Sequence, residues 1–148
     1  GLEIRGDAII PMLLFYPEPL RRGEEAYATP VTLVERAVLP GLSTALGVQQ
    51  DPMLGLVILR TLDCLGEGAL GVSYEIDKAG APYYFVAGLP STTAVETADS
   101  GLGGFVNVAP GIAVVSAKLE RSESAIVPPT SILVRPGWLT GIRFLPGG

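Results

Sequence analysis

The sequence contains no histidine, and this absence removes a large part of enzyme chemistry. Histidine is the most common general base near neutral pH, a frequent proton shuttle and a common zinc ligand. Serine triads of the usual kind and histidine-based metal sites are therefore excluded. The sequence predicts a protein that is not an enzyme, with no catalytic residues, no metal site and no cofactor.

Cysteine is almost absent as well, since Cys64 is the only one. A single cysteine cannot form an internal disulfide, so a disulfide framework gives no information about the cellular compartment. Cys64 lies inside an apolar run, and free cysteines are among the most buried residues of folded proteins. We therefore expect Cys64 to be a buried structural thiol.

Charge is scarce, because charged residues make up 17% of the chain, against about 25% in average soluble domains. The ten basic residues are spread thinly and the net charge is −5, whereas nucleic-acid-binding surfaces cluster lysine and arginine on one face. Nucleic acid is therefore not an expected partner. No apolar run approaches the roughly 18 residues of a transmembrane helix. A chain with few charges and 48% hydrophobic residues favours a protein partner or self-association.

The first 52 residues predict one strand and one short helix. Residues 8–16 are mostly apolar and end at the Pro-Glu-Pro sequence 17–19, which predicts an early strand. Between residues 29 and 47, apolar side chains recur every three or four positions, as one face of a helix requires. Gly47 suits the C-terminal cap because it tolerates a left-handed conformation, and Pro40 limits the helix to a short one or to two unequal turns.

After residue 52 the pattern changes to short strands separated by turns rich in glycine and proline. Residues 54–59 are apolar on both faces, which predicts the central strand. The other predicted strands are 72–76, 83–87, 94–97 at an edge, 105–108, 112–119, 131–135 and 139–144. Within 112–119, the side chains expected to face the core are Ala113, Val115, Ala117 and Leu119.

Two of the turns join consecutive strands and predict hairpins. The expected pairs are 72–76 with 83–87 and 105–108 with 112–119. The fold class that follows is mostly β: a seven- to eight-stranded antiparallel β-sandwich with an N-terminal strand and one short helix.

The segment 97–111, TADSGLGGFVNVAPG, resembles a motif of the carboxypeptidase-regulatory-like family, whose domains are transthyretin-like or prealbumin-like β-sandwiches. In that family, a polar turn that ends in glycine precedes an aromatic residue, a short strand and a Pro-Gly turn. Residues 56–72 and 132–140 match the opening and the last hairpin of such domains. The resemblance covers residues 53–148 and leaves residues 1–52 as an N-terminal extension packed on the sandwich.

This resemblance implies a non-catalytic module of the kind found in secreted proteins and bacterial surface lipoproteins. The expected location is therefore extracellular or at the cell surface. The expected role is that of a structural or adhesion module within a protein assembly.

Carboxylates and glycines give only weak indications of a catalytic site or a phosphate-binding site. The closest non-adjacent carboxylate pairs are Asp63 with Glu67 and Glu96 with Asp99, and two carboxylates can serve glycoside hydrolysis. Solvated loop carboxylates are the favoured interpretation, because Asp and Glu are mostly exposed. Residues 101–104 superficially resemble a phosphate loop, but no lysine follows and the next element is a strand.

Aromatic residues suggest the candidate binding contacts, which are Tyr83, Tyr84 and Trp138. Tyr83, Tyr84 and Phe85 are consecutive, so on a strand at least one ring points away from the core side. Exposed rings at the edges of a sandwich can stack on sugars, which makes a carbohydrate-binding module the alternative function. The competing interpretation is that these rings cover the ends of the core, since aromatics bring a large buried area.

A third function is a virion decoration protein. In that case residues 1–22 would be an arm that wraps around a neighbouring subunit, and the chain would form a trimer.

Overall fold

The computed structural model describes residues 1–15, 31–122 and 124–145, and it confirms a mostly β fold with two packed sheets and one helix. The strands are β1 (Leu2–Ile4), β2 (Met12–Phe15), β3 (Gly55–Thr61), β4 (Val72–Ile76), β5 (Ala81–Val86), β6 (Leu89–Ser91), β7 (Leu102–Val108), β8 (Gly111–Leu119), β9 (Ser124–Val134) and β10 (Leu139–Phe144), and the helix is α1 (Val38–Leu46). In the described part of the chain, no helix has the length and apolar character that crossing a membrane requires.

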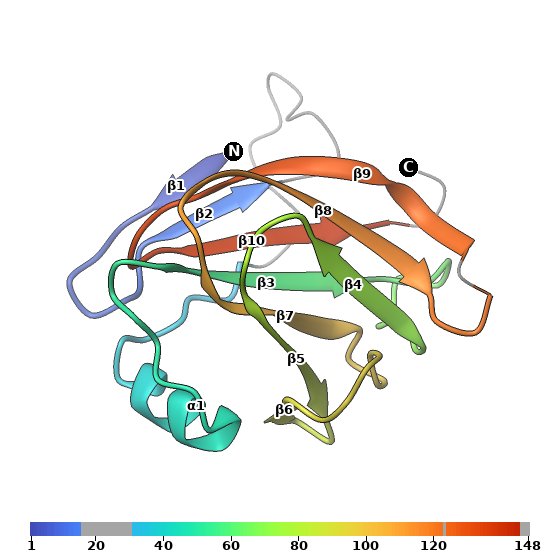
Figure 1. Cartoon of the computed structure of the whole chain (residues 1–148), viewed down its shortest axis with the longest axis horizontal. Coiled ribbons are helices and arrows are strands. Elements are labelled where there is room, and N and C mark those ends of the chain that lie inside the picture. Colours follow the sequence, from blue (N-terminus) through green and yellow to red (C-terminus); the bar gives the residue numbers. More distant parts are fainter. Residues whose placement is uncertain (16–30, 123, 146–148) are drawn as a thin grey trace.

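The larger sheet has seven strands in the order β1-β2-β10-β3-β7-β5-β6, and the smaller sheet has three in the order β4-β8-β9 (Figure 1). Pairing is mostly antiparallel, except that β10 runs parallel to both of its neighbours, β2 and β3. Strand β3 lies fourth of seven, which confirms the predicted central strand. Strands β3 to β10 are eight, as expected for the sandwich, and the N-terminal residues supply two strands, β1 and β2, where one was expected. The sequence patterns gave no signal for β1 and β6, which have three residues each.

The two hairpins predicted from turns are wrong, and so is the last hairpin that the resemblance implied, because each connection carries the chain from one sheet to the other. Strands β4 and β5 lie in different sheets, as do β7 and β8, and β9 and β10. Glycine and proline allow a tight reversal in either geometry, so the turn residues alone cannot distinguish a hairpin from a crossing. The hairpin from β5 to β6 was missed; its turn residues Ala87 and Gly88 both have positive φ, as the type I′ turn requires.

A layer of apolar side chains fills the space between the two sheets. Its largest contributors from the seven-stranded sheet include Leu59 and Phe105, and the small sheet supplies Val115 and Ile132. As predicted, Ala113, Val115 and Ala117 face this core and are almost fully buried. Leu119, at the end of β8, is 43% exposed and does not belong to the core as expected.

One tyrosine joins the two sheets through polar contacts inside this apolar layer. Tyr74, on β4, donates a hydrogen bond from its hydroxyl group to the Gly101 carbonyl oxygen at 2.8 Å. The same hydroxyl lies 2.9 Å from Thr61 Oγ1 on β3, and the Tyr74 backbone N–H donates to the Tyr84 hydroxyl at 3.0 Å. Gly103 on β7 makes room for these rings, since a Cβ there would come within 2.7 Å of the Tyr84 ring.

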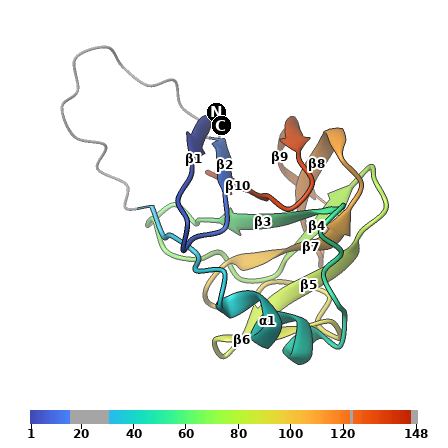
Figure 2. The ribbon, with the colours of Figure 1, turned by 90° about the vertical axis from the view of Figure 1, so that its left-hand side faces the viewer.

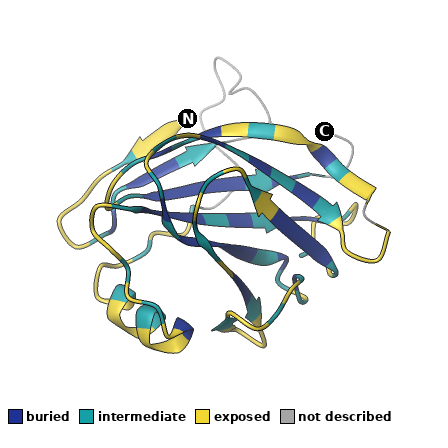
Figure 3. Cartoon of the chain, in the orientation of Figure 1, coloured by how far each residue is buried: buried dark blue, intermediate teal, exposed yellow. Residues whose placement is uncertain are grey.

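The opposite face of the large sheet is covered by α1 and the segment before it, as Figure 2 shows. Leu46 and Ile10 pack there against Leu56 and Tyr83 of the sheet. The short helix and its end at Gly47, which has φ +64° and caps the last turn, are confirmed. The helix begins at Val38, so the apolar period read in residues 31–37 does not belong to it. Pro40 is accommodated because it lies in the first turn, where its missing N–H would have no helical partner. Figure 3 shows that the side of α1 away from the sheet is exposed.

Residues 1–15 belong to the large sheet of their own chain. Strand β2 pairs with β10 from Met12 to Phe15, and β1 pairs with β2. These residues therefore do not form an arm that leaves the molecule. The remainder of the proposed arm, residues 16–22, lies outside the described residues.

Two smaller predictions are wrong. Cys64 is exposed, because the apolar run around it bends into a turn whose residues Leu62 and Gly68 form an isolated bridge. Residues 94–97 are not a strand. Thr97 instead bonds to Val72 and Ala69, which fixes this segment beside β4.

Replacing Tyr74 with phenylalanine tests the bridge between the sheets. The change leaves the Gly101 carbonyl and the Thr61 hydroxyl without this partner in a buried layer, so the free energy of unfolding should fall by about 1–3 kcal/mol in urea denaturation. Tyr83→Phe is the matched control, since that hydroxyl has one long bond of 3.3 Å to the Val57 carbonyl. An equal or larger loss in the control would contradict the assignment.

The buried tyrosines also predict how stability depends on alkaline pH. Burial raises the pKa of Tyr74 and of Tyr83 well above the usual value of 10.0. The two neutral tyrosines stabilise the fold fully at pH values below the tyrosine pKa of the unfolded chain. This stabilisation is lost as the unfolded tyrosines ionise from about pH 10 upward. The free energy of unfolding should therefore fall steeply above about pH 10, and less steeply in Tyr74→Phe. An identical slope in the two proteins would refute this cause.

Candidate functional site

Two of the three predicted contact residues are buried. Tyr83 is 1% exposed and lies under the layer that contains α1, whereas Tyr84 is 4% exposed and lies between the sheets. Alternation along β5 sends one ring to each face, as expected, but both faces of this sheet are covered. Neither ring is available for stacking on a sugar at the surface. Their placement matches the competing interpretation, in which the rings cover the core.

Trp138 is half-buried, and two arginines cover its ring. The guanidinium carbons of Arg5 and Arg135 each lie 4.8 Å from the ring centroid. A guanidinium over an indole face is attracted by the ring quadrupole and contributes about 0.5–1 kcal/mol at an exposed site. A sugar that stacks on this ring would therefore have to displace an arginine.

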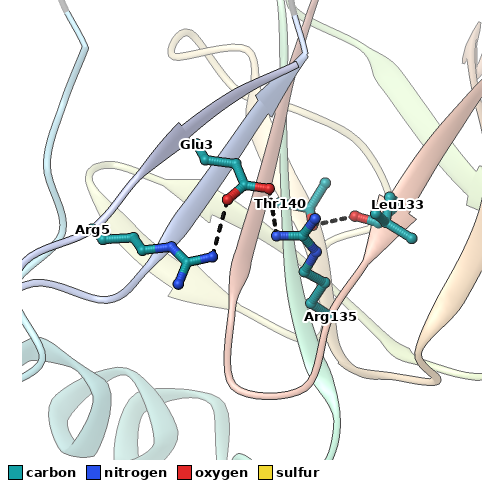
Figure 4. A network of polar contacts seen from close by, with 5 residues as sticks. All are labelled: Glu3, Arg5, Leu133, Arg135 and Thr140. Atoms are coloured by element: carbon teal, nitrogen blue, oxygen red, sulfur yellow. Dashed lines mark hydrogen bonds and ion pairs between the residues drawn. The ribbon is translucent and has the colours of Figure 1, made fainter.

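Glu3 holds the two arginines in place, as Figure 4 shows. One carboxylate oxygen of Glu3 lies 2.6 Å from Arg135 Nη1, and the other lies 3.1 Å from Arg5 Nη2. Close by, Thr140 Oγ1 donates a bond of 2.9 Å to the Leu133 carbonyl oxygen. Glu3 and Thr140 belong to the large sheet, whereas Leu133 lies in β9 and Arg135 directly follows that strand. These contacts therefore tie the two sheets together.

The turn that carries Trp138 is bonded to the beginning of β3. The Leu56 backbone N–H donates to the Trp138 carbonyl oxygen, and the Gly137 N–H donates to the Leu54 carbonyl oxygen, both at 2.9 Å. A hollow of about 370 Å³ lies beside this turn, lined by buried Ile10 and Leu56 and by the more accessible Ser43 and Trp138. Trp138 is therefore the one predicted contact residue that reaches an accessible hollow.

Asn107 fixes the backbone of the segment after α1. The sequence did not predict this role. The Asn107 backbone has φ +56°, a conformation that asparagine tolerates better than most residues. Its amide Nδ2 donates to the Gln49 carbonyl oxygen at 2.9 Å, and its Oδ1 accepts from the Asp51 N–H at 2.7 Å. These bonds attach the segment after α1 to the end of β7. The role of Asn107 is thus to position backbone.

The candidate carboxylates act on the backbone of their own loop. Asp63 Oδ1 accepts the backbone N–H groups of Leu65 and Glu67 at 2.8 and 3.0 Å, which agrees with the loop interpretation of the Asp63 and Glu67 pair. Among the described residues, no three or more cysteine, aspartate or glutamate side chains gather as a metal site would need. Among the described residues around Trp138, no nucleophile is paired with a base.

No model of a known protein family matches the chain, and no curated protein matches its sequence. Among solved structures, the chain is similar to the structure of the streptococcal ancillary pilin, at 18% sequence identity and a TM-score of 0.44. The match covers 67% of this chain and 34% of that chain, so this chain spans about a third of the length of that protein. A likeness at this level says nothing about what the chain does.

The Glu3 contacts predict an unusual titration. Hydrogen bonds from Arg135 and then Arg5 hold the pKa of Glu3 below its ordinary value of 4.5. The stabilisation is therefore present above the pKa of the unfolded chain and is lost as pH falls through the lower pKa of the folded chain. Carboxyl NMR shifts of Glu3 should titrate at lower pH than those of a free glutamate.

In Arg135→Gln, the pKa of Glu3 should return toward 4.5, and Arg5→Gln should have a smaller effect. Arg121→Gln is the control, because Arg121 is an exposed residue between β8 and β9 and makes no contact with Glu3 among the described interactions. If Glu3 titrated identically in Arg135→Gln and in the wild type, the ion pair would not exist in solution.

Proposed function

We propose that the chain is a non-catalytic structural or adhesive β-sandwich module that works in a protein assembly outside the cell or at its surface. One observation carries the proposal: apolar side chains are held exposed on two ordered loops at one end of the sandwich. These loops, residues 62–71 and 94–101, are named here the Leu65 end.

Hydrogen bonds fix the two loops of the Leu65 end against each other. Thr97 is 1% exposed; its Oγ1 donates to the Ala69 carbonyl oxygen at 2.7 Å and accepts the Val72 N–H at 3.0 Å. Backbone bonds add to this, since the Thr97 N–H donates to Val72 and the Gly71 N–H donates to Thr97. Both loops therefore have a defined backbone.

Leucine and valine side chains point outward from this fixed backbone. Leu65 is 86% exposed, Leu70 is 64% exposed and Val95 is 65% exposed. Covering apolar surface is favourable by about 25 cal/mol per Å², and grouped exposed apolar residues mark contact sites. Since the backbone bonds prevent these side chains from folding inward, a protein partner is the means by which they leave water.

Two of the four edge strands, β9 and β6, are poorly suited to pairing with another chain. An open edge strand exposes backbone groups that can pair with another chain. Strand β9 carries Pro128 and Pro129 where its register with β8 shifts, and β6 has three residues and contains Pro90. Proline lacks the N–H that a new strand would need. The loops therefore present a better contact surface than these two edges.

The finer assignments belong to this proposal. The resemblance of residues 53–148 to carboxypeptidase-regulatory-like domains supports a secreted module, with residues 1–52 as its extension. The carbohydrate alternative retains Trp138 alone, because Tyr83 and Tyr84 are buried. The virion decoration alternative loses its main support, because residues 1–15 pair within their own sheet.

Light-scattering mass measured over a range of concentrations tests the proposal. The wild-type chain should form oligomers through the Leu65 end, whereas Leu65→Glu combined with Leu70→Glu should remain monomeric, because buried charge opposes the contact. Ile112→Glu is the matched control, since Ile112 is 70% exposed on β8 and lies outside both loops.

A wild-type chain that stays monomeric at every concentration would contradict self-assembly. Affinity electrophoresis in a panel of polysaccharides would then examine the remaining alternative, and retardation lost in Trp138→Ala would favour a carbohydrate module.

A further inference from the structure

The outer edge of the large sheet at β1 offers backbone groups for pairing with another strand. Strand β1 is the first of that sheet and pairs on one side, with β2 (Figure 1). On the other side of β2, the Pro11 carbonyl oxygen accepts the Leu139 N–H of β10 at 2.9 Å. Backbone groups alternate in direction along a strand, so Leu13 also bonds toward β10, whereas Met12 and Leu14 bond toward β1.

This alternation directs the backbone groups of Glu3 away from the sheet. In an antiparallel ladder, every second pair of opposed residues exchanges hydrogen bonds. Leu2 opposite Leu14 and Ile4 opposite Met12 are therefore the bonded pairs, and the Glu3 N–H and carbonyl groups point outward. Within the described residues, neither of these two groups has a hydrogen-bond partner. They are available to a further strand.

The other three edges of the two sheets are less open. Strands β9 and β6 contain prolines, as described above. At β4, Thr97 bonds to both the N–H and the carbonyl group of Val72. The next outward group, the Tyr74 N–H, donates to the Tyr84 hydroxyl. Strand β1 is therefore the edge at which a new strand meets free backbone groups.

The segment 2–5 is complementary to itself in the antiparallel direction. Glu3 and Arg5 lie two residues apart and their side chains meet on one face of the sheet (Figure 4). A two-fold axis at Ile4 places Glu3 of each copy opposite Arg5 of the other, so the four charges alternate in sign. Opposite charges on opposed residues stabilise paired strands, and like charges destabilise them. A register centred on Glu3 would instead oppose two glutamates.

We propose that β1 pairs antiparallel with β1 of a second copy of this chain, in the register that sets Glu3 against Arg5. The outward backbone groups of these two residues then bond to each other on both sides of the axis, and Ile4 contacts Ile4 of the second copy. Strand β1 has three residues, so this contact is much smaller than the roughly 1,200 Å² of a stable interface. It is transient on its own, and it is separate from the Leu65 end.

Disulfide trapping tests the contact, because it captures copies that meet only briefly. The full chain carries Cys64→Ser, which removes its exposed thiol, and Leu65→Glu with Leu70→Glu, which removes the contact of the proposed function. In this background, Ile4→Cys should give a covalent dimer with oxidised glutathione, read on a non-reducing gel. The Cα atoms of such a pair are about 4.5 Å apart, within the roughly 4.4–6.8 Å that a disulfide spans.

Leu2→Cys is the matched control, because it lies on the same strand and the same face and is 40% exposed. In the proposed register, position 2 of one copy lies about 14 Å along the strands from position 2 of the other. The Leu2→Cys dimer should therefore form at least tenfold more slowly than the Ile4→Cys dimer. Equal rates at the two positions, or no dimer in Ile4→Cys, would overturn the proposal.

A second measurement avoids any change in β1. In the background chain without the added cysteine, NMR amide shifts of Glu3 and Arg5 should change with concentration up to the millimolar range, while that of Ile112 on β8 stays constant. Constant shifts at all three positions would also contradict the contact. Because the background lacks the leucines of the Leu65 end, failure of this proposal leaves the proposed assembly function to its own test.

Discussion

The Tyr74 hydroxyl group bonds to Thr61 and Gly101 within the apolar layer between the two sheets, and the relative position of the sheets depends on this layer. After β3, the chain passes from one sheet to the other four times. In the part of the chain that the structure describes, no backbone ladder joins the sheets, so packing and side-chain bonds hold them together. Tyr74 supplies one such tie, and the contacts of Glu3 and Thr140 supply another.

Sequence patterns predicted most of the strands but not their pairing, and the reason is physical. Alternation in residues 72–76 and 112–119 reports local burial, which is sufficient to identify β4 and β8. Pairing depends on which strands share a sheet, and the turns at residues 78–82 and 109–111 suit a hairpin and a crossing equally well. The short helix was predictable because its period and Gly47 are local signals. The exposure of Cys64 could not be predicted, because it depends on a turn that is closed by the bridge between Leu62 and Gly68.

The candidate sites show the same division between local and long-range information. The aromatic residues at positions 83, 84 and 138 were visible in the sequence, but whether a face of the sheet is covered by another layer is a tertiary property. The outward direction of the Glu3 backbone groups was invisible, because it follows from the pairing of β2 with β1 and β10. Likewise, the sequence did not reveal that the loops carrying Leu65 and Val95 are joined by the bond from Thr97 to Ala69.

Rigidity is what keeps the proposed contact surface at the Leu65 end exposed. A flexible loop would turn Leu65 inward and lower its exposed apolar area, but bonds from Asp63 and Thr97 fix the backbone. The scaffold thus keeps these apolar side chains in a state that water disfavours. A partner that covers the leucines would therefore gain binding energy without having to reorganise the protein.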